Sequence, residues 1–140
     1  MRYWDSSAVV PLLIEEETTA TAVEWLAGDS RAVTWWGTRV ECVSALARRA
    51  REGAFREAEV ADAIARLDSL SEAWAEVTPG EGVRRTAIRL LRAYPLRAAD
   101  ALQLAAAIAT ADGSPGSVPF VTLDDRLADA ASKEGFPILR

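Results

Sequence analysis

Residues 96–107 read Leu96-Arg97-Ala98-Ala99-Asp100-Ala101-Leu102-Gln103-Leu104-Ala105-Ala106-Ala107, and they give the strongest indication of how this chain is organised. Alanine and leucine favour helix, so we expect a long helix from Arg97 or Ala98 to about Thr110. Asp100 interrupts this apolar run. A carboxylate that faced the core unpaired would be costly. Asp100 therefore pairs with Arg97, caps the first turn, or belongs to a functional site.

Three further acidic residues occupy comparable positions. Asp5 ends the first apolar strand, Asp124 ends a late strand, and Glu41 lies in the first turn of a helix. Together with Asp100 they describe a cage of carboxylates for a divalent metal ion. A metal ion held in this way can activate water and stabilise a phosphodiester under attack.

Each of these residues also has a local interpretation. Asp5 and Asp124 can cap the helices that follow them. Thr38-Arg39-Val40-Glu41 matches a capping box, with Thr38 at the N-cap and Glu41 at the third position. Four coincidences in one chain are much less expected than one, so a shared site is the favoured interpretation.

The composition excludes several kinds of site. The chain has no histidine and one cysteine, Cys42, which excludes histidine-based catalytic triads, a disulfide framework and histidine-rich zinc sites, argues against a structural zinc site, and fits a reducing compartment. Any metal must be held by oxygen, which indicates Mg²⁺ or Mn²⁺. The net charge of −5 weakens a nucleic-acid-binding interpretation without excluding it.

Membrane signals are missing from the sequence. The N-terminus lacks a signal-peptide hydrophobic region, and the longest apolar stretch, Ala98 to Ala111, is too short to cross a bilayer. We therefore expect a soluble, cytoplasmic protein with no membrane partner.

Strands and helices alternate along the chain, which shows no repeat or linker and reads as one domain, residues 1–140. We expect strands at residues 2–5, 32–35, 76–78, 118–123 and 136–139. We expect helices at residues 7–13, 15–27, 38–51, 55–70, 82–93, 98–110 and 125–133, with Pro11 in a first turn. This alternation predicts a parallel sheet covered on both faces. Ligands bind outside the carboxyl ends of such strands, where Asp5 and Asp124 lie.

Four segments carry a family resemblance in the expected order. They are Asp5-Ser6-Ser7-Ala8-Val9-Val10, Arg39-Val40-Glu41-Cys42-Val43-Ser44-Ala45-Leu46, the stretch quoted above, and Val121-Thr122-Leu123-Asp124-Asp125-Arg126-Leu127-Ala128. They resemble the motifs of the PIN-domain nucleases, and especially the VapC-type toxins of toxin–antitoxin pairs. The resemblance covers essentially the whole chain. It implies an α/β protein, a three-layer α/β/α single PIN domain over residues 1–140, with a central parallel sheet of about four to five strands.

The resemblance also implies a set of site residues. The acidic quartet carries over as catalytic and metal-binding residues Asp5, Glu41, Asp100 and Asp124, and the small hydroxyl residues beside it carry over as Ser7 and Thr122. Asp125 leaves open which carboxylate faces the metal, although the Thr-x-Asp spacing favours Asp124. The implied cofactor is Mg²⁺, with Mn²⁺ as an alternative, and the number of metal ions stays open.

By the same resemblance, the chain would be an endoribonuclease that acts as a toxin. Its implied partners are an RNA substrate, a cognate VapB-type antitoxin and a second copy in a homodimer. Exposed Trp or Leu side chains would then line an apolar antitoxin groove beside the site. The RNA target, its cleavage sequence and the identity of the antitoxin are left open.

Other function classes account for the same residues less well. A PIN-type nuclease of RNA processing or DNA repair and a catalytically inactive binding module share the fold; the intact quartet argues against the second. A carboxylate-Mg²⁺ phosphatase fits poorly, because the chain has Asp5-Ser6-Ser7 in place of an Asp-x-Asp motif and a single lysine, Lys133. Arg85, Arg89 and Arg92 share one helix face. The favoured interpretation is a solvated face, and the alternative is a surface that binds the phosphates of RNA.

Overall fold

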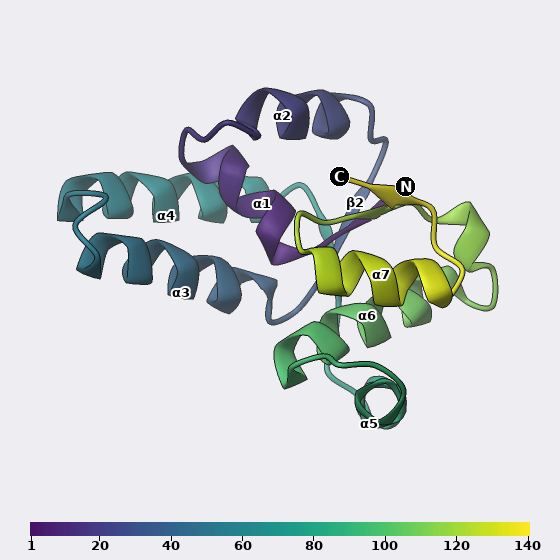
Figure 1. The fold of residues 1–140 in the computed structure, drawn as a ribbon. Helices are drawn as coiled ribbons and strands as arrows, with labels where there is room; N and C mark the ends of the chain where they lie inside the picture. The colour runs from purple at the N-terminus through teal and green to yellow at the C-terminus, as the bar shows by residue number, and fades with distance from the viewer.

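The computed structural model describes all residues from Met1 to Arg140. Its strands are β1 (Arg2–Trp4), β2 (Ala32–Trp35), β3 (Ala75–Val77), β4 (Phe120–Val121) and β5 (Ile138–Leu139). Its helices are α1 (Ser6–Leu13), α2 (Thr19–Ala27), α3 (Thr38–Arg51), α4 (Glu57–Ser71), α5 (Glu81–Ala93), α6 (Ala98–Ala111) and α7 (Asp125–Lys133), with a short 3₁₀ turn at Pro115–Ser117. Figure 1 shows their arrangement.

The five strands form one parallel sheet in the order β3-β2-β1-β4-β5. The expected parallel sheet is therefore confirmed. Tyr3 of β1 lies level with Val33 of β2 on one side and with Phe120 of β4 on the other. From β1 the chain first builds outward through β2 and β3, and it then returns to place β4 on the opposite side. The crevice at such a reversal, beyond the carboxyl ends of β1 and β4, is where ligands bind in sheets of this type.

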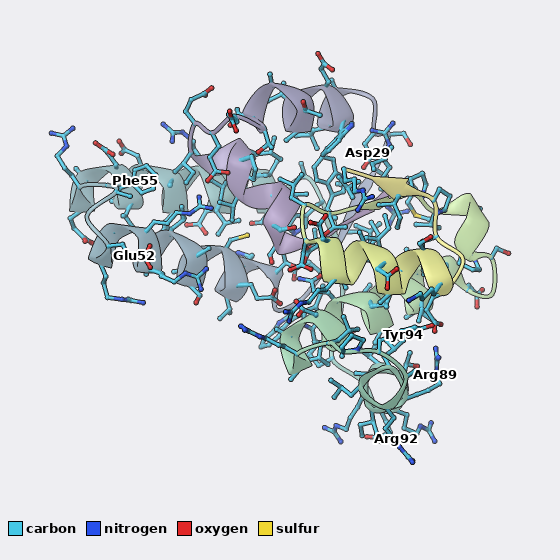
Figure 2. The ribbon with its side chains drawn as sticks, in the orientation of Figure 1. Asp29, Glu52, Phe55, Arg89, Arg92 and Tyr94 are labelled. Atoms are coloured by element: carbon cyan, nitrogen blue, oxygen red, sulfur yellow. The ribbon has the colours of Figure 1, made fainter.

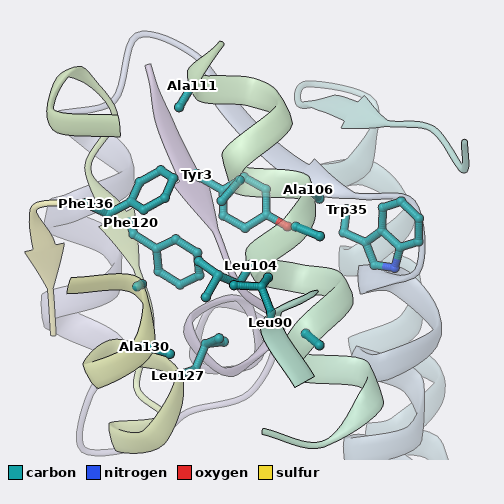
Figure 3. Packing of buried hydrophobic residues seen from close by; sticks show 14 of the residues in the cluster. Tyr3, Trp35, Leu90, Leu104, Ala106, Ala111, Phe120, Leu127, Ala130 and Phe136 are labelled. Atoms are coloured by element: carbon teal, nitrogen blue, oxygen red, sulfur yellow. The ribbon is translucent and has the colours of Figure 1, made fainter. Parts of the chain in front are cut away.

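Two apolar cores enclose the sheet, because successive side chains of a strand point to opposite faces. Tyr3 and Phe120 pack with the helices α5, α6 and α7, and the two rings stack with centroids 5.1 Å apart. Figure 3 shows this core, with Leu104 and Ala106 of α6 beside the rings. On the other face, Trp4 and Val121 pack with α1, α3 and α4. The three-layer α/β/α prediction is thus confirmed.

Helices α3 and α4 form an antiparallel pair that extends to one side of the sheet (Figure 1). Leu46 of α3 and Leu67 of α4 are buried in the core that this pair shares with α1. Because α3 starts directly after β2, this packing fixes the first turn of α3, which carries Glu41, at the carboxyl end of the sheet.

Some local boundaries differ from expectation. Helix α1 begins at Ser6, directly after Asp5, so Pro11 lies in the interior of the helix and not in its first turn. Helix α2 begins at Thr19 and not at Glu15, because the hydroxyl of Thr19 accepts from the backbone N–H of Glu16 and donates to the carbonyl of Pro11. These bonds make residues 14–18 a tight connection between two helices. Strand β4 is only Phe120–Val121, shorter than the expected 118–123, and it follows the 3₁₀ turn Pro115–Ser117.

None of the helices combines the length and the apolar character that a membrane span requires.

Candidate active site

A cleft of about 1030 Å³ opens beyond the carboxyl end of the sheet. Three of the four predicted carboxylates line it, Glu41 from α3, Asp100 from α6 and Asp124 from the end of the β4 segment. Asp5 is only 3% exposed and lies below the floor formed by Ser6 and Ser7. Residues far apart in the sequence are therefore brought to one place, as the strand-end argument predicted.

Asp5 is held by its neighbours from two strand ends. Its Oδ2 accepts from the backbone N–H and the hydroxyl of Ser7, and from the Thr122 hydroxyl at 3.0 Å. The Ser7 hydroxyl also accepts from the N–H of Leu123 at 2.8 Å, which joins the β1 and β4 segments. The capping role expected for Asp5 is confirmed, since it is the N-cap of α1. Burial raises the pKa of Asp5, although these hydrogen bonds act in the opposite direction.

Glu41 does not take part in a capping box, and that interpretation was wrong. The N-cap of α3 is Gly37, and Thr38 is already the first helical residue. Tertiary contacts replace the local ones, because the Glu41 carboxylate accepts from the Ser6 hydroxyl at 2.9 Å and from Gln103 Nε2 at 3.2 Å. Burial, aided by the charges of Asp5 and Asp100, raises the pKa of Glu41 to about 7.

Asp100 lies in the first turn of α6 and faces the cleft, while Ala101 and Leu104 on the same helix face the core. The cost of an unpaired core carboxylate is thus avoided, and Asp100 forms no ion pair with Arg97. Burial and then the charge of Asp124 raise the pKa of Asp100.

Asp124 caps α7 by accepting from the N–H of Leu127 at 2.8 Å, so its expected structural role is confirmed. The neighbouring Asp125 also borders the cleft, but its side chain is 93% exposed and pairs with Arg140. The geometry therefore favours Asp124 over Asp125 as the carboxylate directed at the site.

The acidic side chains share one electrostatic environment. The charge of Asp100 raises the pKa values of Asp5 and Glu41, and the charge of Asp124 raises that of Asp100. No three acidic or cysteine side chains lie close enough together to hold a metal ion by themselves. Mg²⁺ does not require this, because it usually keeps several waters and takes one or two carboxylates together with substrate phosphates. The donor set, made only of oxygens, fits such an ion.

Basic side chains also line the cleft, and sequence reasoning missed them. Arg48, Arg97 and Arg126 are exposed there and form no ion pair. Arg97 and Arg126 each lie within three residues of a quartet member, and this proximity was the available signal.

The arginine face of α5 lies outside the cleft. Arg85, Arg89 and Arg92 are exposed, and Arg89 pairs with Glu134 of the α7 C-terminus at 2.8 Å. Figure 2 shows Arg89 and Arg92 on α5, with Arg89 close to Tyr94. The reading of these arginines as a solvated face fits the structure better than a track leading to the site.

Comparison with known proteins adds to this geometry. The family model described as the PIN domain matches residues 2–133. The chain belongs to the PIN-domain family. Two curated relatives from Mycobacterium tuberculosis strains, the ribonucleases VapC45 and VapC49, are each 37% identical over 95% of this chain and 90% of their own length. The chain is thus a PIN domain of the VapC type.

Solved structures share the fold at lower identity. The sarcin-ricin loop cleaving toxin VapC20 of Mycobacterium tuberculosis aligns with a TM-score of 0.70 and 19% identity over 100% of this chain and 99% of that one. A toxin–antitoxin complex from Klebsiella pneumoniae aligns with a TM-score of 0.63 and 15% identity over 100% of this chain and 97% of that one. At these identities the likeness supports the α/β/α PIN fold alone.

Proposed function

We propose that this PIN domain is a Mg²⁺- or Mn²⁺-dependent endoribonuclease that acts as the toxin of a toxin–antitoxin pair. The observation that carries the proposal is the convergence of Glu41, Asp100 and Asp124 on one cleft with Asp5 buried beside it, where burial and neighbouring carboxylates raise the pKa values of Asp5, Glu41 and Asp100. A site that crowds carboxylates in this way gains from a divalent cation. The two curated relatives are named ribonucleases, which supports RNA as the substrate.

Glu41, Asp100 and Asp124, with Asp5 below them, would hold the metal ion. When bound, the ion would supply an activated water and neutralise charge on the scissile phosphate. The chain's own residues would set the geometry. Ser7 and Thr122 fix Asp5, and the Leu127 N–H fixes Oδ1 of Asp124. No histidine is needed for this chemistry.

The unpaired arginines of the cleft would bind the RNA backbone on either side of the scissile phosphate. Guanidinium groups match phosphate oxygens in a planar, two-point geometry. Arg97 and Arg126 lie near enough to Asp100 for their charges to lower its pKa, against the larger effect of burial. They would place positive charge directly beside the acidic site, and so they would offset the net charge of −5 where RNA approaches.

A panel of cellular RNAs, with DNA of the same sequences as the control, tests the substrate. The purified protein is incubated with each nucleic acid in Mg²⁺, in Mn²⁺ and in EDTA. We expect internal cleavage of RNA with either metal and none in EDTA. Cleavage of DNA at an equal rate would contradict a ribonuclease and would point to a nuclease of wider specificity.

We also propose where the antitoxin binds. Trp36 and Val40 are 55% and 67% exposed, and they line a groove with the apolar residues Val43, Ala47 and Leu67 and with polar and charged residues of α3, α4 and β3. Val40 also lines the catalytic cleft, so the groove and the cleft adjoin. An apolar antitoxin segment in this groove could extend an arginine into the acidic cleft and compete for the place of the metal. One solved structure that shares this fold is a toxin–antitoxin complex from Klebsiella pneumoniae, which supports a partner of this kind.

Substitution of one exposed apolar residue in the groove tests this second proposal. We expect Trp36→Ser to retain metal-dependent cleavage but to escape inhibition by the co-expressed antitoxin. The matched control is Ile88→Ser on α5, an equally exposed apolar residue outside the groove, which should remain inhibited. Inhibition of Trp36→Ser as strong as that of the wild type would place the antitoxin elsewhere. The homodimer, also proposed, is tested by sedimentation of the purified protein.

A further inference from the structure

A chain of buried hydrogen bonds leads from the core of the sheet to the site. The Tyr3 hydroxyl donates to Gln103 Oε1 at 2.7 Å, and Gln103 Nε2 donates to Thr38 Oγ1 at 3.0 Å and to Glu41 Oε1 at 3.2 Å. Tyr3, Thr38 and Gln103 are all 0% exposed. The chain therefore joins strand β1, helix α3 and helix α6 at the one point where they meet under the cleft.

The direction of these hydrogen bonds is fixed by the carboxylate. A carboxylate that binds a metal ion is ionised and only accepts, so the Gln103 amide must turn its Nε2 toward Glu41. Its carbonyl oxygen then faces Tyr3, which must donate. Figure 3 shows the Tyr3 ring lying against α6, the helix that carries Gln103. The phenol thus holds the amide in the orientation that Glu41 needs.

Packing alone does not account for a glutamine at this place. The other residues of α6 between Ala101 and Ala107 that lie in the core are alanine and leucine, and a buried amide costs free energy unless it is hydrogen-bonded. Gln103 donates one of its two N–H groups to Glu41, a residue of the cleft. On the other side, Ser6 donates to Glu41 Oε2 at 2.9 Å. Donors on two different helices, α1 and α6, therefore each bind one carboxylate oxygen of Glu41. The loss of either hydrogen bond would leave the Glu41 side chain free to rotate.

We propose that Gln103 is a positioning residue that fixes the Glu41 carboxylate for metal binding, and that Tyr3 in turn fixes Gln103. This inference rests on the proposed metal-dependent function. Gln103 does not touch the metal or the RNA; it acts through Glu41. Partners that orient metal-binding side chains typically contribute 10- to 100-fold to metal affinity or activity.

Titration calorimetry with Mn²⁺ tests the inference, because metal affinity responds to positioning and is measured without turnover. The first variant is Gln103→Met, which keeps the length of the side chain and removes the donor. We expect it to bind Mn²⁺ roughly 10- to 100-fold more weakly than the wild type. Tyr3→Phe keeps Gln103 but releases its amide, and it should weaken binding in the same direction by a smaller factor. Thermal melts in EDTA show that each variant is folded.

Tyr94→Phe is the matched control for Tyr3→Phe. It removes the same phenol, which donates to Glu134 Oε1 at 2.7 Å on α7, away from the cleft. It should leave Mn²⁺ affinity unchanged. Equal Mn²⁺ affinity in Gln103→Met and the wild type would overturn this inference but leave the proposed function standing. If Gln103→Met does not fold, an unchanged affinity in Tyr3→Phe would overturn it. A wild type that binds no divalent metal would overturn the proposed function and this inference with it.

Discussion

Substituting Glu41 with glutamine should stabilise the metal-free protein at high pH and not at low pH. The raised pKa of Glu41, about 7 against a usual 4.5, means that the folded state disfavours the ionised carboxylate. Below pH 4.5 the group is protonated in both states and no penalty exists. As the pH rises from 4.5 to 7 the unfolded chain ionises first, so this group progressively lowers the stability of the wild type, and the loss is complete above pH 7.

The size of the effect follows from the two pKa values. A rise from 4.5 to about 7 corresponds to about 3 kcal/mol, at roughly 1.4 kcal/mol per pH unit. Partial exposure of the carboxyl reduces the expected gain to about 1–3 kcal/mol. Glutamine keeps both hydrogen bonds, because its carbonyl oxygen accepts from Gln103 and its amide donates to the Ser6 hydroxyl, which can also accept. The substitution therefore removes the charge with little loss of contacts.

Urea unfolding of both proteins in EDTA at pH 4 and pH 8 measures this gain in stability. The free energy of unfolding of Glu41→Gln should exceed that of the wild type by about 1–3 kcal/mol at pH 8 and equal it at pH 4. The control is Glu52→Gln at the exposed C-cap of α3, which should change stability little at either pH. A Glu41→Gln protein that is less stable than the wild type at pH 8 would refute the reasoning, because Glu41 would then be a stabilising ion in the apo fold.

Four further outcomes follow from the same contacts. Asp100→Asn should abolish cleavage and raise the melting temperature of the metal-free protein, since it removes a charge that Asp124 repels; a large destabilisation would show a structural role. Mg²⁺ or Mn²⁺ at 100 times its dissociation constant should stabilise the wild type by about 2.7 kcal/mol in a thermal melt, and Asp100→Asn by much less. Arg97→Ala should raise the KM for RNA severalfold, whereas Arg92→Ala on the outer face of α5 should not. Thr34→Val should increase the free energy of unfolding by up to about 1 kcal/mol, because the buried Thr34 hydroxyl has no hydrogen-bond partner; a loss of stability would contradict this.

The main features of the fold could be predicted from the sequence because they depend on short-range patterns. Alternating strands and helices predicted the parallel sheet, and the positions of Asp5 and Asp124 after their strands predicted a shared edge. The alanine- and leucine-rich residues from Ala98 onward predicted helix α6. These signals lie within a few residues of one another, where propensity and periodicity decide the outcome.

The supporting contacts could not be predicted in the same way. Glu41 and Gln103 are separated by 62 positions and Ser6 and Glu41 by 35, so nothing local connects them. The prediction of a capping box was wrong for the same reason. Its sequence pattern is present, yet Glu41 makes tertiary bonds in place of the local one. The sequence assigned no role to Gln103, because its polar role depends on Tyr3 and Glu41, which the fold alone brings together.

The account depends most directly on metal-dependent RNA cleavage by the acidic quartet. The measurement is cleavage of one RNA substrate by the wild type and by Asp100→Asn, each with Mn²⁺ and with EDTA, after thermal melts have shown both proteins to be folded. The account predicts cleavage by the wild type with Mn²⁺ only, and none by Asp100→Asn in either condition. Equal cleavage by the two proteins, or wild-type cleavage that persists in EDTA, would contradict it.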